Sequence, residues 1–309
     1  PPGDAAALAA GPFADLADEE IVFLNGRALN PAKKIRVEPN ASRAIALRFL
    51  SRATHTAHAA ALALDVEAGG SLLLLESYEG AGEGYIADAT LDIRLGEGAR
   101  LQRIVVVDEV ADAVAVSTAE IELSPRATLA QTVLTSGAKR QRFETRVQHA
   151  LGATARLDGV YLLAGERRAD LTSEVVHGAP GASTEQLTKG CVRDQARAVF
   201  QGRIIVARGV DGTDARMGHH ALILSDRAEV DAKPELEIYA DDVACSHGNT
   251  VGALDEEALF YVRQRGVPDA EARALLTEAF VGEVVDRIQH DGARDVARAW
   301  VGARLGAAS

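Results

Sequence analysis

Aromatic residues are scarce in this chain, at 4% of its 309 residues, which argues against a core built on large rings. Hydrophobic residues still make up 47% of the sequence and charged residues 25%, the balance of a folded, soluble protein rather than a disordered one. A core of stacked Val, Leu, Ile and Ala side chains fits this composition. The length suits one elongated domain or two compact ones.

Cysteine is also rare. The two cysteines, Cys191 and Cys245, provide neither a disulfide framework nor a Cys-x-x-Cys zinc or redox motif. Because disulfides belong to oxidising compartments, we expect a reducing, cytoplasmic location.

Long apolar runs and basic clusters are both missing. No apolar stretch approaches the roughly 20 residues of a membrane-spanning helix, so we expect no membrane insertion. The net charge is -12, and no run of Lys or Arg is long enough to follow a phosphate backbone. This charge balance argues against nucleic acid as a partner.

Common catalytic motifs are absent as well. There is no Gly-x-Ser-x-Gly elbow, no Walker loop, no His-Glu-x-x-His, and no Gly-x-Gly-x-x-Gly that opens a strand–helix unit. We therefore do not expect an autonomous hydrolase, ATPase or dehydrogenase, and predict that the chain is not an enzyme.

What the sequence does contain is a loose repeat of apolar residues around a small one. The small residues Gly70, Ala99, Ala127 and Ala153 follow one another at intervals of 29, 28 and 26 residues, and a further copy lies at Ala228. This spacing favours a mainly β fold in which each copy marks a corner of one β-solenoid coil, although a β-sandwich with glycine-containing hairpins stays open. Strands are predicted at the branched aliphatic runs Leu72–Leu75, Ile104–Val107, Val160–Leu163 and Ile204–Val206.

The two ends of the chain differ from this middle part. Asn25-Gly26 lies between apolar runs within Ile21–Leu29, which is a strong hairpin signal. We therefore divide the chain into an N-terminal segment with a β-hairpin (1–45), a β-helix core (46–254) and a C-terminal helical region (255–309).

Three helices are predicted in the C-terminal region. Asp255 is a suitable N-cap for a helix that runs to about Gln264, where Gly266 and a proline follow. We expect Asp269 to cap a second helix with a wide apolar face, and a third amphipathic segment spans Arg294–Leu305. Such faces pack on the β-body or bind a partner.

Cys245-Ser246-His247 is the sharpest chemical feature. Residues two apart in a strand share a face, so this spacing places a thiol and an imidazole side by side. Both groups bind iron or zinc, but two ligands do not close a metal site. The alternative is a buried cysteine that only packs.

Other polar residues support weaker hypotheses. The pair Asp241 and Asp242 could serve the acid–base chemistry of solenoid sugar-cleaving enzymes. The alternative is that both carboxylates lie on a solvated strand edge, and we prefer this alternative. Histidines also occur in pairs. The pairs are His55-x-x-His58 and the adjacent His219 and His220. We interpret each as a surface or locally hydrogen-bonded residue rather than a metal ligand, and adjacent histidines in a strand also face opposite ways.

The segment Lys233–Asp255, which reads KPELEIYADDVACSHGNTVGALD, closely resembles the signature of the SufB/SufD family of iron–sulfur cluster assembly proteins. The likeness continues downstream through Leu259–Gly266 and upstream through Lys189–Ile204, and it covers about residues 158–288. The Cys-Ser-His-Gly form resembles the SufD branch of the family.

The resemblance implies a right-handed parallel β-helix with terminal helices, acting as a scaffold in a SufBCD complex. It implies that SufB pairs across the β-helix and that Cys245 and His247 lie at this interface. A transient iron–sulfur cluster shared with SufB would form there, with no cofactor held tightly by the isolated chain. Alone, the chain would be a possible homodimer. The SufC ATPase would dock on the C-terminal helices, through Leu259, Phe260, Leu275, Leu276 and Phe280. The alternatives are a solenoid carbohydrate-active enzyme and a homodimeric structural β-helix protein.

The sequence departs from the family pattern at several positions. Met217 and His219 stand where the family has Gln and Asn, and Cys191 replaces an aliphatic residue, so we interpret Cys191 as packing. The part before the hairpin is much shorter than the helical N-terminal domain typical of the family.

Overall fold

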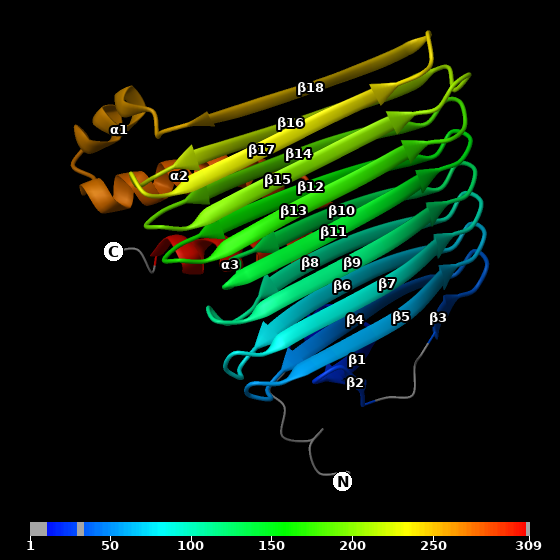
Figure 1. Ribbon diagram of the computed structural model, residues 1–309, viewed down its shortest axis with the longest axis horizontal. Coiled ribbons are helices and arrows are strands. Elements are labelled where there is room, and N and C mark those ends of the chain that lie inside the picture. The colour runs from blue at the N-terminus through cyan, green and yellow to red at the C-terminus, as the bar shows by residue number, and fades with distance from the viewer. Residues whose placement is uncertain (1–10, 30–33, 307–309) are drawn as a thin grey trace.

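The computed structural model describes residues 11–29 and 34–306, whose strands wind into a parallel β-solenoid (Figure 1). Successive strands alternate between two sheets, so neighbours within a sheet come from successive coils. The first sheet, in spatial order, contains β18 (Val243–Gly252), β16 (Thr213–Ile223), β14 (Ser183–Val192), β12 (Thr154–Leu163), β10 (Thr128–Thr135), β8 (Arg100–Asp108), β6 (Ser71–Gly80), β4 (Ser42–Ser51), β1 (Glu19–Leu24) and β2 (Arg27–Ala28). The second contains β17 (Glu229–Ile238), β15 (Arg197–Val206), β13 (Arg168–His177), β11 (Arg140–His149), β9 (Val114–Leu123), β7 (Ile86–Leu95), β5 (Ala57–Val66) and β3 (Lys34–Val37).

The parallel pairing decides between the two predicted architectures. Hairpins of a β-sandwich join antiparallel neighbours, whereas β6 pairs β8 and β10 pairs β12 in parallel. The β-sandwich alternative is therefore wrong and the mainly β solenoid is confirmed. The four aliphatic runs predicted as strands lie in β6, β8, β12 and β15.

The repeat spacing follows from the strand register. Arg100 pairs with both Ser71 and Thr128, and Thr128 pairs with Thr154, so each interval of the repeat is one coil. The small residues before these strand starts are fully buried at the corner, where a larger side chain would not fit. Ala228 corrects the prediction, because it lies in the β16–β17 turn at the opposite corner.

The described residues form two large hydrophobic cores and one small cluster of Tyr85, Ala113 and Ala138. One large core fills the interior between the sheets, including the stack of Phe23, Phe49 and Tyr78 with ring centroids 4.8 and 4.6 Å apart. The other lies on the outer face of the ten-stranded sheet, where strand residues such as Leu162 pack against helix residues such as Val284. Aliphatic side chains dominate both cores, as the composition predicted.

The N-terminal hairpin prediction is confirmed. β1 and β2 pair antiparallel, with Leu24 opposite Arg27, and Asn25 and Gly26 both have positive φ, at 46° and 76°. These are the backbone angles that a two-residue turn of this kind requires. Residues 1–10 and 30–33 of the N-terminal segment lie outside the described residues.

The chain continues from β18 into α1 (Glu256–Arg263), α2 (Asp269–Val285) and α3 (Asp291–Gly306); a short 3-10 helix, η2 (Ala14–Leu16), lies near the N-terminus. The Asp255 cap is confirmed, since its carboxylate accepts the N–H groups of Glu257 and Ala258. Asp269 is not a cap. Pro268 holds that position, and the Asp269 carboxylate instead pairs with Arg263 and Arg273. None of the helices formed by described residues is long and apolar enough to cross a membrane.

Candidate functional site

Cys245 and His247 lie on β18, the last strand of the ten-stranded sheet, which has only one neighbour (Figure 1). Cys245 pairs with Ala215 and His247 with Met217, and both partners are buried in the solenoid interior. The two side chains therefore share the inward face of β18, as the i, i+2 spacing predicted. In the part of the chain that the structure describes, no further coil stacks on them, so Cys245 is half-buried and His247 is exposed.

The surface around Cys245 and His247 is formed by the terminal coil of the solenoid. β17 is likewise the last strand of its sheet. Its inward residues Val230, Ala232 and Leu236 are only partly buried against the interior core. Ile238 is 40% exposed and Val251 on β18 is 42% exposed. We call this surface, formed by β17 and β18, the open end.

The environment of Cys245 keeps its thiol protonated. Burial raises the pKa of Cys245 above its ordinary value, and the nearby Asp214 carboxylate adds to this, while a backbone hydrogen bond at Ala215 opposes it. Within the described residues, no group of three or more His, Cys, Asp or Glu side chains is placed to hold a metal ion. Cys245 and His247 thus offer two of the roughly four ligands of a closed metal site.

A buried hydrogen-bonded chain leads from the interior to β18. The Tyr161 hydroxyl lies 2.9 Å from His219 Nε2, and His219 Nδ1 lies 2.7 Å from Asn249 Oδ1. The Asn249 oxygen accepts, so Nδ1 carries the proton and Nε2 accepts from Tyr161. Phe200 stacks on the His219 ring at 4.5 Å. The sequence alone does not predict this series of hydrogen-bonded side chains, because only strand register brings Tyr161, His219 and Asn249 together.

The other candidate residues have local roles. Asp241 and Asp242 are exposed in the β17–β18 turn, and the Asp242 carbonyl accepts the Gly212 N–H. His58 Nε2 lies 2.9 Å from the Ser51 hydroxyl, and His220 Nδ1 lies 2.7 Å from that of Thr250. His219 and His220 do face opposite ways, since His219 is buried inside while His220 is partly exposed.

Three large apolar side chains on α1 and α2 are exposed. Phe260 is 62%, Tyr261 59% and Leu275 52% exposed. Leu259, predicted as a partner contact, is only 1% exposed and is corrected to a core residue. Leu276 and Phe280, named for the same role, pack partly buried against the core under the helices. Cys191 is buried in that core too, which confirms the packing interpretation.

Fold and site together define a parallel β-solenoid whose last coil exposes a Cys/His pair beside unpaired sheet edges. Residues 47–280 match the model for the SufBD core domain of SUF system FeS cluster assembly, which covers more than half of the chain. The chain belongs to the SufB/SufD family.

Individual relatives agree with this membership. The chain is 38% identical over 153 residues to the iron–sulfur cluster assembly protein SufD of Escherichia coli, covering 50% of the chain and 36% of that protein. It is 34% identical over 205 residues to an iron–sulfur cluster assembly SufBD family protein of Synechocystis, covering 66% of the chain and 45% of the relative. It is also 30% identical over 237 residues to the chloroplastic protein ABCI7 of Arabidopsis thaliana, covering 75% of the chain and 50% of the relative. The chain thus spans half or less of the length of these relatives.

Proposed function

We propose that this chain is a non-catalytic scaffold subunit of SUF iron–sulfur cluster assembly, which pairs with SufB through its open end. Cys245 and His247 would supply part of the ligand set of a nascent cluster at that interface. The observation that supports this most is their position on the inward face of β18, the terminal strand of its sheet, inside the segment that matches the family core.

The ligand count suits a cluster that must leave again. A stable cluster is held by about four protein ligands, whereas this chain offers two at the open end. SufB would provide the others, so the site would exist only in the complex. The raised pKa of the Cys245 thiol fits this proposal, because coordination to iron would then displace a proton and the isolated chain would bind iron poorly.

The helical region would dock the SufC ATPase. Phe260 and Tyr261 on α1 and Leu275 on α2 are exposed apolar residues, remote from the open-end ligands in sequence. Exposed aromatic residues of this kind are typical anchors of protein interfaces. SufC and SufB would therefore bind different surfaces of the same chain.

Co-expression with SufB and SufC tests the ligand role. We expect His247→Ala and Cys245→Ala each to lower the iron and sulfide content and the visible cluster absorbance of the purified complex several-fold. Ser246→Ala is the matched control, because Ser246 lies between them on the same strand and its side chain faces outward. Melting curves should be unchanged in the Ser246 and His247 variants, since both residues are exposed, whereas Cys245→Ala should lower the melting temperature only slightly because Cys245 is half-buried. Normal cluster content in the His247 variant would contradict its assigned role.

A further inference from the structure

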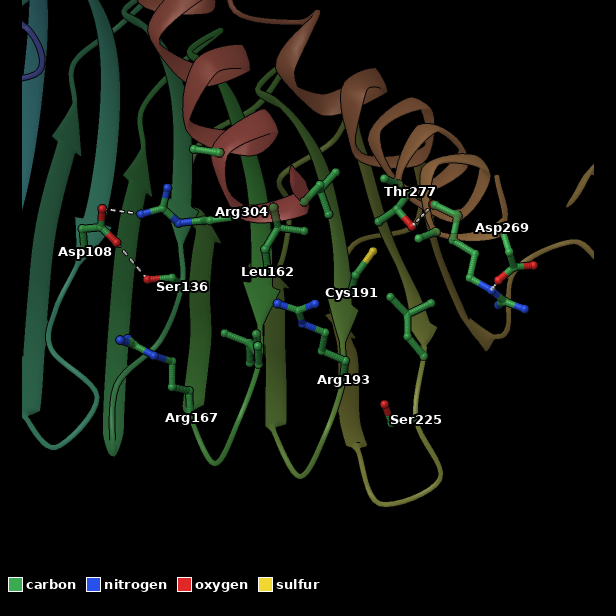
Figure 2. Close-up of a pocket in the computed structure, with 18 residues that line it drawn as sticks. Asp108, Ser136, Leu162, Arg167, Cys191, Arg193, Ser225, Asp269, Thr277 and Arg304 are labelled. Atoms are coloured by element: carbon green, nitrogen blue, oxygen red, sulfur yellow. Dashed lines mark hydrogen bonds and ion pairs between the residues drawn. The ribbon is translucent and has the colours of Figure 1, made fainter. Parts of the chain in front are cut away.

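A cavity of about 650 Å3 lies away from the open end, between the outer face of the ten-stranded sheet and helices α2 and α3 (Figure 2). Its volume falls in the range of about 300–1,000 Å3 that is typical of small-molecule sites. One part of its wall is apolar and comes from strands and helix alike: Leu162, Cys191, Leu224, Ala274 and Leu305.

The polar part of the wall carries more positive than negative charge. Figure 2 shows Arg304 on the last turn of α3, Arg167 and Arg193 below it in the connections that follow β12 and β14, and Asp269 across the cavity on α2. The full set of charged lining residues is Arg167, Arg193, Arg273, Arg304, Asp108 and Asp269.

Only two of these four guanidinium groups are neutralised at close range. Arg304 pairs with Asp108, and Arg273 donates to Asp269 at 2.8 Å. Arg193 has Asp194 as its carboxylate neighbour, at 4.0 Å. Within the described residues, Arg167 forms no ion pair.

Arg167 is instead fixed by backbone groups. Its Nη1 donates to the carbonyls of Glu109, at 2.9 Å, and Gly137, at 2.6 Å. These bonds hold the guanidinium in place but do not cancel its charge. Burial lowers the pKa of Arg167, and the charge of Arg304 lowers it further, although Asp108 acts in the opposite direction. An anion in the cavity would relieve this repulsion.

We propose that the cavity binds a small anionic amphiphile, whose carboxylate or phosphate group contacts Arg193 and Arg167 and whose apolar part packs on Leu162, Leu224 and Leu305. Guanidinium groups bind either head group through paired N–H donors, so the two chemistries share one recognition. The apolar wall excludes a bare inorganic ion as the best ligand, since such an ion would leave that wall uncovered.

Isothermal titration of the full chain with octanoate and with octyl phosphate tests the proposal, with 1-octanol as the uncharged probe. We expect saturable binding of at least one anion, with the tighter of the two identifying the head group. Octanol should bind at least ten-fold more weakly. The single tryptophan, Trp300, gives a second readout, because the Arg304 guanidinium lies 3.9 Å from its ring and lines the cavity.

Variants separate this site from general hydrophobic binding. Arg193→Gln should weaken binding about ten-fold or more through loss of a charge-assisted contact. Arg167→Gln should weaken binding to a similar extent. If the Arg167 variant does not fold, the affinity of Arg193→Gln alone tests the proposal. Arg94→Gln is the control, because Arg94 is 68% exposed on β7 of the eight-stranded sheet, where it pairs with Glu122 on β9. Equal affinity of Arg193→Gln and the unaltered chain, equal binding of octanol, or no binding of either anion would overturn the proposal.

Discussion

Two histidines stack inside the solenoid, one coil apart. His149 and His177 pair in register, with ring centroids 4.5 Å apart, and the Nε2 atoms of both lie within 3.1 Å of the Thr184 hydroxyl. Burial lowers the pKa of His149 to about 3, with the neighbouring His177 contributing, and burial lowers that of His177 to about 4. Both rings are therefore neutral at physiological pH.

This stack makes the protein sensitive to mild acid. An unfolded histidine takes up a proton below about pH 6.5, whereas the folded pair stays neutral until pH 3–4, so stability falls as the pH drops through this range. We expect each ring to contribute a loss of about 2 kcal/mol between pH 7.5 and pH 5.

Urea denaturation of the His177→Gln variant at pH 7.5 and pH 5 checks this, since glutamine keeps hydrogen-bonding groups but does not titrate. The loss on acidification should be about 2 kcal/mol smaller than in the unaltered chain. His247→Gln is the control, because His247 is exposed. An unchanged pH dependence in His177→Gln would contradict the prediction.

At the scale of elements, the docking of α2 on the sheet depends on a buried carboxylate. Asp158, on the outer face of β12, is 3% exposed, and its Oδ2 lies 3.0 Å from Nε of Arg287, which follows the C-terminal end of α2. Burial raises the pKa of Asp158 to about 6, although Arg287 and Arg156 hold it lower than burial would alone. Arg287 also reaches Glu185 at 3.0 Å, which ties the helix to two strands.

Removing this arginine should loosen the helices. We expect Arg287→Ala to cost about 3 kcal/mol at pH 7.5, because it leaves Asp158 with reduced compensation in a dry environment. Arg298→Ala, which breaks an exposed ion pair with Asp286, should cost less than about 1 kcal/mol.

The pH dependence of the same variant gives a second test. A carboxyl whose folded pKa lies above its unfolded value favours the folded state at low pH, and this contribution is lost as the pH rises from about 4 to above 6. The penalty of Arg287→Ala should therefore shrink at pH 5. Adding Asp158→Asn should recover part of the stability at pH 7.5, and a failure to recover any would contradict the role of the buried charge.

At the scale of the whole molecule, the open end is the surface through which we propose that the chain assembles with a partner. Terminal strands with free N–H and C=O groups and exposed apolar residues pair readily with another strand edge. We expect the isolated chain to self-associate through this end in a concentration-dependent way, and SufB to replace the second copy.

Sedimentation velocity across a concentration series, with and without SufB, measures this. Val251→Lys together with Ile238→Lys should abolish the dimer and weaken SufB binding with little loss of stability, because both residues are exposed. Ile86→Lys is the matched control, since Ile86 is 52% exposed on β7, far along the solenoid. A dimer that persists in the double variant must use another surface.

Much of this architecture could be derived from residue order. The repeat interval, the aliphatic strands, the Asn25-Gly26 turn and the Asp255 cap depend on local backbone preferences, which a sequence displays directly. The shared face of Cys245 and His247 follows from the two-residue period of any strand. The helix start at Asp269 was mispredicted as a cap because a proline before it already sets the backbone for the first turn.

The remaining features required the folded coils. Tyr161, His219 and Asn249 meet because strand register stacks residues some 30 or 58 positions apart, and no local pattern encodes that register. The burial of Leu259 arises where α1 packs beside α2, and the arginine-lined cavity arises where α2 and α3 close over a sheet face; both depend on packing angles rather than periodicity. The Cys245–His247 pair shows both sources: its chemistry can be read from two residue types, whereas its exposure exists because β18 is the terminal strand and no other described strand stacks beyond it.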